Sequence, residues 1–252
     1  MEPQDSRAEV IARLRPYVER AKRLKGFQLE VDPIPLGPPL PWNYEARARE
    51  LLAGARSVLD MGTGGGEGFS EILRGSQVFA VATEPWSPNV SVAARWLRRF
   101  GAVVVHANSL ALPFADEAFD LVLNRHEELD PAEVARVLAP GGHLLTQQVH
   151  DDNWKELRTF FPRMTDFGPL FQRYQDGLRA SGVEIKRAEM HETPSAYRDL
   201  DIAYLLTALP WEVPDFDVSR DIEALMTLGR ALRRPEGIVL TEGRYLIEGH
   251  KP

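Results

Sequence analysis

The sequence predicts an α/β protein built on a doubly wound, mostly parallel sheet of seven strands. It also predicts a helical extension before the sheet and a helical insertion ahead of the last strand. Three observations lead to this prediction. Short apolar runs alternate with helical patterns from residue 56 to residue 149, a glycine-dense turn follows the first run, and further helical patterns flank this region.

The first 45 residues predict a helix and then an extended segment. Ser6 and Glu9 have the spacing of a capping box, and apolar residues recur at helical spacing up to Gly26. The proline-dense stretch from Pro33 to Pro41 excludes helix and requires extended chain. A second helix is expected to end near residue 54.

The central part predicts alternating strands and helices. Helices are expected near residues 66–74, 88–100, 131–138 and 169–181. Strands are expected near residues 56–61, 77–83, 102–106, 119–124, 142–149, 183–191 and 244–248. Ligands bind at the carboxyl ends of parallel strands, so polar residues there are candidates for a site: Asp60, Glu84, Asn108 and Asn124.

These patterns divide the chain into an N-terminal extension (1–45), a core domain (46–192 and 237–252) and an inserted segment (193–236). The insertion has two helical patterns separated by Pro210 and Pro214, with Trp211 between them. Because it precedes the last strand, we expect it to cover the cleft on the substrate side, together with the N-terminal segment.

Composition excludes several classes of function. The 252 residues carry a formal net charge of −7, which argues against a dedicated nucleic-acid binder, whose affinity depends on neutralising phosphates. The chain has no cysteine, so it has no disulfide and no thiolate metal site. It has neither an apolar signal region nor a stretch long enough to span a bilayer, so the expected location is the cytoplasm. Nothing in the composition indicates the oligomeric state.

The most informative segment is Val58-Leu59-Asp60-Met61-Gly62-Thr63-Gly64-Gly65-Gly66. Glycines let the backbone adopt positive φ and approach a ligand closely. The third glycine of the dinucleotide fingerprint is replaced by Glu67, which argues against an NAD(P) dehydrogenase. Asp60 at the end of the strand would repel a pyrophosphate but suits a cationic ligand. S-adenosylmethionine is such a ligand, with an ammonium, a sulfonium and no phosphate.

This segment resembles the first motif of class I S-adenosylmethionine-dependent methyltransferases, a family with a Rossmann-like fold. Asn108-Ser109-Leu110-Ala111-Leu112-Pro113-Phe114 is similar to a stretch of the type-11 subgroup that begins with aspartate, and Asn108 departs from it. The segment from Glu133 to Gly142 is similar to the subgroup's helix-to-strand turn. The resemblance covers roughly residues 55–150.

The resemblance implies a set of cofactor contacts. The methionine end and the turn would be held by Asp60, Gly62, Thr63 and Gly64, and Glu84 would bind the ribose hydroxyls. Asn108 and Ser109 would contact the adenine, Trp86 would lie against the adenosine, and Asn124 completes the expected set.

The sequence gives fewer indications of the residues that contact the methyl acceptor. His126, after the fourth strand, is a candidate general base or a packing residue, and Arg125 could bind an anionic group or pair with Glu127, Glu128 or Asp130. Gln148, Tyr204 and Trp211 are candidate substrate contacts, with ordinary packing as the alternative for the aromatics. Asp152 and Asn153 could imitate the magnesium ligands of catechol-type methyltransferases, but strand four ends in Asn124 and not in aspartate, so we expect no metal.

The sequence therefore predicts an S-adenosylmethionine-dependent methyltransferase that acts on an oxygen, nitrogen or carbon of a small molecule. Two alternatives stay open: an RNA or protein methyltransferase, and a protein that binds S-adenosylmethionine without turnover.

Overall fold

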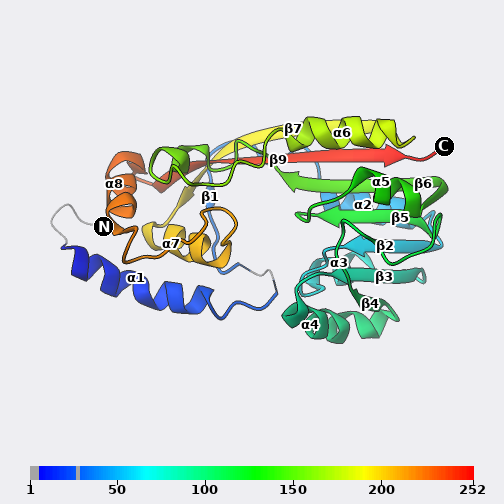
Figure 1. Cartoon of the computed structure of the whole chain (residues 1–252), viewed down its shortest axis with the longest axis horizontal. Coiled ribbons are helices and arrows are strands. Elements are labelled where there is room, and N and C mark those ends of the chain that lie inside the picture. The colour runs from blue at the N-terminus through cyan, green and yellow to red at the C-terminus, as the bar shows by residue number, and fades with distance from the viewer. Residues whose placement is uncertain (1–5, 27–28) are drawn as a thin grey trace.

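A single sheet organises the computed structural model, which describes residues 6–26 and 29–252 (Figure 1). Its body has the strand order β7-β9-β6-β5-β2-β3-β4. Paired neighbours run parallel except for β9, which is antiparallel to both β6 and β7. These strands are β2 (Ser57–Met61), β3 (Phe79–Glu84), β4 (Val103–His106), β5 (Phe119–Arg125), β6 (Leu138–Val149), β7 (Glu184–Tyr197) and β9 (Gly237–His250). The predicted seven-stranded doubly wound sheet is confirmed, and β1 (Ile34–Pro35) and β8 (Arg233–Arg234) add two short strands at its margins.

Helices cover both faces of the sheet because each has one apolar side. One face packs against α2 (Tyr44–Leu52), α3 (Glu67–Ile72) and α4 (Ser87–Leu97), with a core that includes Ala48, Phe69 and Leu97. The other face packs against α5 (Pro131–Val137) and α6 (Leu170–Ala180), with a core that includes Val134 and Leu178. This three-layer arrangement leaves the carboxyl ends of the parallel strands at one edge.

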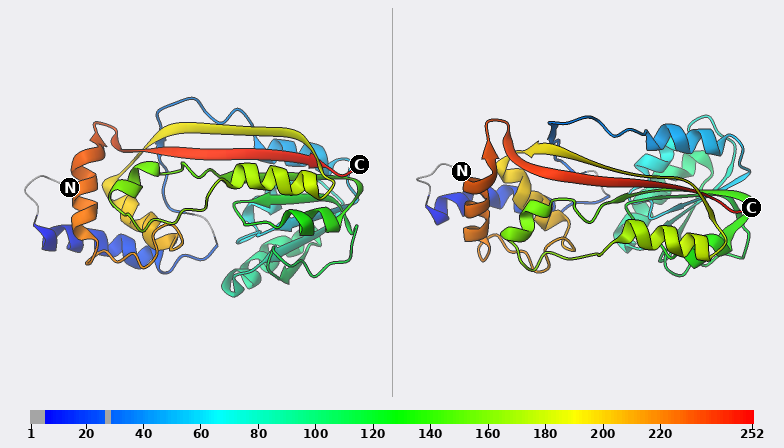
Figure 2. Two further views of the ribbon diagram at one scale, coloured as in Figure 1. Left: turned by 45° about the horizontal axis from the view of Figure 1, so that its top comes forward. Right: turned by 90° about the horizontal axis from the view of Figure 1, so that it is seen from above.

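The last two strands are longer than expected. β7 and β9 have 14 residues each, and their pairing continues beyond the sheet from Thr193 with Glu242 to Tyr197 with Ile238. At about 3.4 Å per residue each strand spans about 45 Å. The result is a two-stranded ribbon that leads from the sheet to a second lobe (Figures 1 and 2).

This second, helical lobe is built from segments far apart in the sequence. It contains α1 (Arg7–Ala21), α7 (Asp199–Ala208), α8 (Ile222–Leu232) and the 3-10 helix η2 (Lys155–Thr159). The capping box at Ser6 is present. One apolar core joins these elements, with Val10, Leu14, Phe161, Ile202, Leu206, Leu225 and Leu228 among its buried members.

Two further connections join the lobes beside the ribbon. The segment after α1 reaches the sheet, where the Gly26 amide donates a 2.8 Å hydrogen bond to the side-chain oxygen of buried Asn89. The proline-dense segment then crosses the ribbon, with the Leu36 amide donating to the carbonyl of Pro194. Within residues 6–26 and 29–252, no helix combines the length and apolarity needed to cross a bilayer.

Candidate functional site

The turn after β2 has the backbone conformation that its glycines allow. Gly62, Gly64 and Gly66 have φ values of 68°, 61° and 86°, a region that residues with a Cβ rarely adopt. The Thr63 amide donates to the carbonyl of Thr83 at 2.9 Å, which fixes the turn against β3. A Cβ on Gly62 would lie 2.4 Å from the Cβ of Glu127, so this glycine also leaves room for the segment after β5.

Glu84, at the end of β3, holds the turn from the side. Its two carboxylate oxygens accept hydrogen bonds from the amides of Gly64 (2.7 Å) and Trp86 (2.9 Å). The side chain is buried, and burial raises its pKa. Each carboxylate oxygen can accept a second hydrogen bond, so Glu84 can still bind ligand hydroxyls.

Two further carboxylates share this pocket. Asp60 is 7% exposed, and burial raises its pKa to about 7, with a contribution from the negative charge of Glu84. Burial and the charges of Glu84 and Glu128 raise the pKa of Glu127 to about 7. Three carboxyl groups gathered in a poorly hydrated site favour a ligand that brings positive charge.

The residues expected at the adenine and adenosine lie around the same edge. Ser109 is fully buried. The Asn108 side chain is exposed, and its oxygen accepts a hydrogen bond from the Leu110 amide at 2.7 Å, forming a local turn. Trp86 is 47% exposed at the start of α4, where a ligand could contact it.

Asn124 and Gln148 form a buried support beneath the turn after β5. The Asn124 side-chain oxygen accepts from the Thr146 hydroxyl at 2.8 Å and from the Gln148 amide, while the Asn124 amide nitrogen lacks a protein partner. Gln148 also donates to the carbonyl of Glu127 at 2.8 Å. The amide nitrogen of Gln148 is therefore used inside the protein, and a contact between Gln148 and substrate stays a prediction. The side-chain nitrogen of Asn124 is thus a buried donor without a partner among the described residues.

His126 occupies the tip of the turn after β5. Its φ of 64° is in the left-handed region, and its amide donates to the carbonyl of Gln147 at 2.9 Å. Crowding by surrounding atoms, together with the charges of Arg244 and Arg125, lowers its pKa to about 3. Although the residue lies in a crowded region, part of its surface is exposed to water. A neutral imidazole can accept a hydrogen bond, and a lowered pKa weakens His126 as a general base.

Three expected substrate contacts have partners within the protein. Arg125 pairs with Glu45 at 2.5 Å, and not with Glu127, Glu128 or Asp130. Tyr204 is 1% exposed in the core of the helical lobe, and its hydroxyl accepts from the Glu30 amide, so the expectation that it faces the cleft is wrong. Trp211 is 45% exposed, and its carbonyl accepts from the Thr165 hydroxyl.

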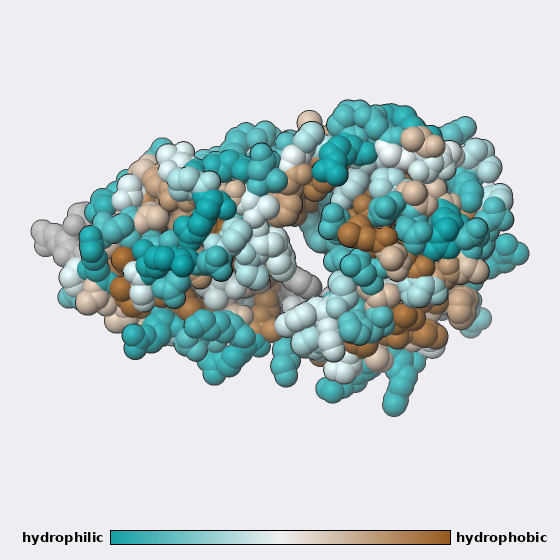
Figure 3. Space-filling view, in the orientation of Figure 1, coloured by the Kyte–Doolittle hydropathy of each residue, from teal (hydrophilic) through white to brown (hydrophobic). Residues whose placement is uncertain are grey.

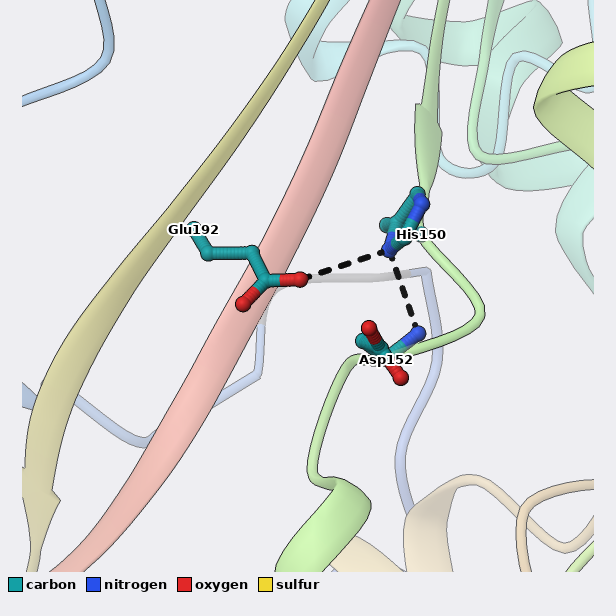
Figure 4. Close-up of side chains that lie close together, drawn as sticks. All are labelled: His150, Asp152 and Glu192. Atoms are coloured by element: carbon teal, nitrogen blue, oxygen red, sulfur yellow. Dashed lines mark hydrogen bonds and ion pairs between the residues drawn. The ribbon is translucent and has the colours of Figure 1, made fainter.

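A cluster of His150, Asp152 and Glu192 brings potential metal ligands together (Figure 4). Both ring nitrogens of His150 are already engaged: Nδ1 accepts from the Asp152 amide at 3.2 Å, and Nε2 lies 2.8 Å from a carboxylate oxygen of Asp151. The Lys155 ammonium lies 2.9 Å from Glu192. The cluster thus carries its own cation, so its geometry does not require a metal.

The space between the lobes is open to solvent. Figure 3 shows the molecule hollowed there, between the sheet and the helical lobe. A groove of about 610 Å³ lies on the ribbon, lined by the proline-dense segment and by Trp42, Thr193, Ser195 and Glu242. The Trp42 indole donates to the side-chain oxygen of Gln147 at 2.7 Å, and the Gln147 side-chain nitrogen lies 3.5 Å from His126.

Sequence reasoning missed three functional candidates. Glu127 was considered only as a partner for Arg125, although the glycine opposite it was a signal of close approach. Gln147 has the same chemistry as its neighbour Gln148, and only the structure shows that its buried side chain contacts Trp42 and His126. Arg244 lies in the last strand, where no motif marks it.

Comparisons with known proteins relate the chain to methyltransferases. Residues 59–146 match the family model described as a methyltransferase domain. The chain is 32% identical over 124 residues to the demethylmenaquinone methyltransferase of Thermus thermophilus, an alignment that covers 44% of this chain and 56% of that protein. The chain thus matches little more than half of that relative's length.

Solved structures show the same fold. The YcgJ protein of Bacillus subtilis superimposes with a TM-score of 0.62 at 19% identity, covering 82% of this chain and 97% of that one. A protein of unknown function from Deinococcus radiodurans superimposes with a TM-score of 0.63 at 15% identity, covering 94% of this chain and 100% of that one.

Proposed function

Because the chain carries a domain of the methyltransferase family over residues 59–146, we propose that it transfers a methyl group from S-adenosylmethionine to a small-molecule acceptor. The reaction would take place between the carboxyl edge of the sheet and the helical lobe.

The observation that supports this proposal best is the charge of the pocket. Asp60, Glu84 and Glu127 gather around a glycine turn whose backbone leaves room for a ligand, and burial raises the pKa of each. A cationic ligand would compensate for the water that these buried carboxylates have lost, because its positive charge stabilises their ionised form. The orphaned amide of Asn124 offers a neutral donor at the same edge. These residues fit an adenosyl ligand with an ammonium and a sulfonium.

S-adenosylmethionine supplies an activated methyl group on its sulfonium, so the protein must mainly bind, align and keep out water. Asp60 and Glu127 would bind the cationic end, and Glu84 would hold the ribose while it fixes the turn. His126 would orient the acceptor by accepting a hydrogen bond, because its low pKa disfavours a role as base.

The groove on the ribbon, which is linked to the His126 turn through Trp42 and Gln147, has room for a small acceptor. The groove of about 610 Å³ falls in the size range of small-molecule sites. The net charge of −7 disfavours a polyanionic acceptor such as RNA.

Titration calorimetry would test cofactor binding. We expect S-adenosylmethionine and S-adenosylhomocysteine to bind and NADH not to bind. Glu84→Ala should lose about 2 kcal/mol of affinity, or about thirtyfold, because hydrogen bonds to a charged group are removed. Glu84→Gln should lose less, and Glu71→Ala, which removes a carboxylate paired with Arg74 on an exposed face, should bind as the parent does. NADH binding without adenosyl-ligand binding would refute the proposal.

A second measurement would separate the alternatives. Protein incubated with S-adenosylmethionine labelled on its methyl group and a cell extract should label the fraction that passes an ultrafiltration membrane. Label retained with RNA or protein would show a macromolecular acceptor, and binding without any transfer would indicate a protein that does not turn the cofactor over.

A further inference from the structure

We propose that the methyl acceptor carries one anionic group, a carboxylate or a phosphate, and that the guanidinium of Arg244 binds it on the inner face of the β7–β9 ribbon. This inference rests on the proposed function, since it assigns the acceptor side of the same cleft.

Arg244 is placed on the side of the site away from the cofactor turn. It lies in β9, opposite Val149 at the carboxyl end of β6 and opposite His191 of β7. The strand order puts β9 two positions from β5 and three from β2. With strands about 4.8 Å apart, Arg244 lies laterally about 10 Å from the His126 turn and about 14 Å from the cofactor strand. That offset suits the far end of a small acceptor.

The guanidinium is anchored but not neutralised. One terminal nitrogen of Arg244 donates to the side-chain oxygen of Asn153 at 2.7 Å and to the carbonyl of Gly243 at 2.8 Å. Both acceptors are neutral, and no carboxylate within residues 6–26 and 29–252 lies within 4.0 Å of it. A guanidinium has five N–H donors in a rigid fork. The remaining donors are therefore available for a bidentate contact with a carboxylate or phosphate.

The acids nearest to Arg244 do not cancel its charge. Glu242, two residues away on the same strand face, accepts a hydrogen bond from the Tyr197 hydroxyl. Glu212 is 8% exposed, and burial raises its pKa, although Arg244 and Arg158 oppose this shift. Arg158 likewise donates to carbonyls, those of Thr165 and Asp151. Within the described part of the chain, neither Arg244 nor Arg158 forms an ion pair with a carboxylate.

The two ends of the cleft thus carry opposite charge. Glu84 makes the cofactor end negative, and Asp60 and Glu127 add to this charge once they are ionised, whereas Arg244 brings positive charge to the acceptor end. An acceptor with an anionic group would be repelled by the first and attracted by the second, so only one orientation would bind. Its uncharged end would then lie at the His126 turn, next to the transferred methyl group.

Calorimetry with four small probes would test the anion site. Benzoate, phenyl phosphate, benzamide and benzylamine share a ring and differ in charge, and each would be titrated into free protein and into protein saturated with S-adenosylhomocysteine. We expect millimolar binding of benzoate, phenyl phosphate or both, and no measurable binding of the other two. The stronger anion shows whether a carboxylate or a phosphate is preferred.

Variants would assign the binding to Arg244. Arg244→Met should weaken anion binding at least tenfold, and Arg244→Lys, which keeps the charge without the fork, should fall between that variant and the parent. Arg187→Met is the matched control, since it removes an arginine of the same ribbon that is already paired with Glu189. It should bind anions as the parent does. Unchanged affinity for S-adenosylhomocysteine would show that each variant is folded.

Equal binding of benzoate and benzamide, or anion binding that survives in Arg244→Met, would overturn the inference. If Arg244→Met fails to fold, a weaker preference for anions in Arg244→Lys than in the parent decides in favour of the inference, and an unchanged preference decides against it. Arg244-dependent anion binding without S-adenosylhomocysteine binding would refute the proposed function alone.

Discussion

Asp60 and Glu127 retain protons near neutral pH because both carboxyl groups are removed from water and face Glu84. A cationic ligand would reverse this situation, since it stabilises the ionised form of each group. Ligand binding should therefore release protons, and its strength should depend on pH in the range where these groups titrate.

We expect the affinity for S-adenosylmethionine to rise with pH between 6 and 8. For one group with a pKa of about 7 that must be ionised in the complex, the apparent Kd is about tenfold weaker at pH 6 than at pH 8. Calorimetry across this range would show it, and Asp60→Asn should bind more weakly with a shallower dependence. A flat profile in the parent protein would contradict the prediction.

The raised pKa of Asp60 also predicts how folding stability depends on pH. The pKa of Asp60 is raised above its unfolded value of 3.8, so its ionisation in the unfolded chain lowers the folding stability progressively from about pH 4 to pH 7. Asp60→Asn should therefore unfold at a higher temperature than the parent at pH 8. Asp120→Asn should do the opposite, because hydrogen bonds from Arg56 and Ser57 lower the pKa of Asp120 despite some burial.

Among the elements, the sheet could be predicted from the sequence, but the ribbon and the lobe packing could not. β2, β3 and β5 are short apolar runs bounded by turns, so periodicity locates them within two residues. The outer halves of β7 and β9 contain Pro194, Ser195 and Glu242, which resemble loop residues until the partner strand is known. Tyr204 was misplaced because α7 is apolar on most sides, and sequence alone cannot tell which side faces the lobe core.

The candidate site, like the fold, could be predicted only in part from the sequence. Glycines and acids at the ends of buried strands could be located from the sequence because local chemistry fixes them. The roles of Gln148, Arg125 and Arg244 depend on partners from other elements, namely Glu127, Glu45 and Asn153. Such pairings are set by tertiary packing and leave no local pattern.

Potential metal ligands lie at the loop after β6, but we expect activity to be independent of divalent metal. The His150, Asp152 and Glu192 cluster is held by its own hydrogen bonds and by Lys155, so a metal would have to displace these contacts. Once an acceptor is known, methyl transfer should continue in EDTA. Loss of activity that Mg²⁺ restores would contradict this prediction, and failure of restoration in Asp152→Asn would locate the metal at this cluster.

For the whole molecule, the two lobes and the links between them suggest a motion that closes the cleft. The helical lobe has its own core and faces the carboxyl edge of the sheet across the open space (Figures 1 and 3). The links are the ribbon, the segment around Gly26, the proline-dense segment and the segment after β6. Closure would bring the lobe towards the bound ligand and exclude water.

Hydrogen exchange would test this closure. Amides of the link that contains Trp211, residues 209–217, should exchange faster than the sheet in free protein because few regular backbone hydrogen bonds protect them. S-adenosylhomocysteine should slow exchange there and at residues 22–26. Slowing confined to the turn at 62–66 and to residues 84–86 would show that the lobe does not respond to the ligand.

The position of β9 also constrains how the chain reaches its native state. β9 lies between β6 and β7, yet it is synthesised after both, so β7 has no partner in the body of the sheet until residues 237–250 emerge. The apolar face of α1 likewise waits for α7, almost 200 residues later. Contacts this distant in sequence slow folding. Partly made chains should therefore expose apolar surface and depend on chaperones until the last strand inserts and completes both lobes.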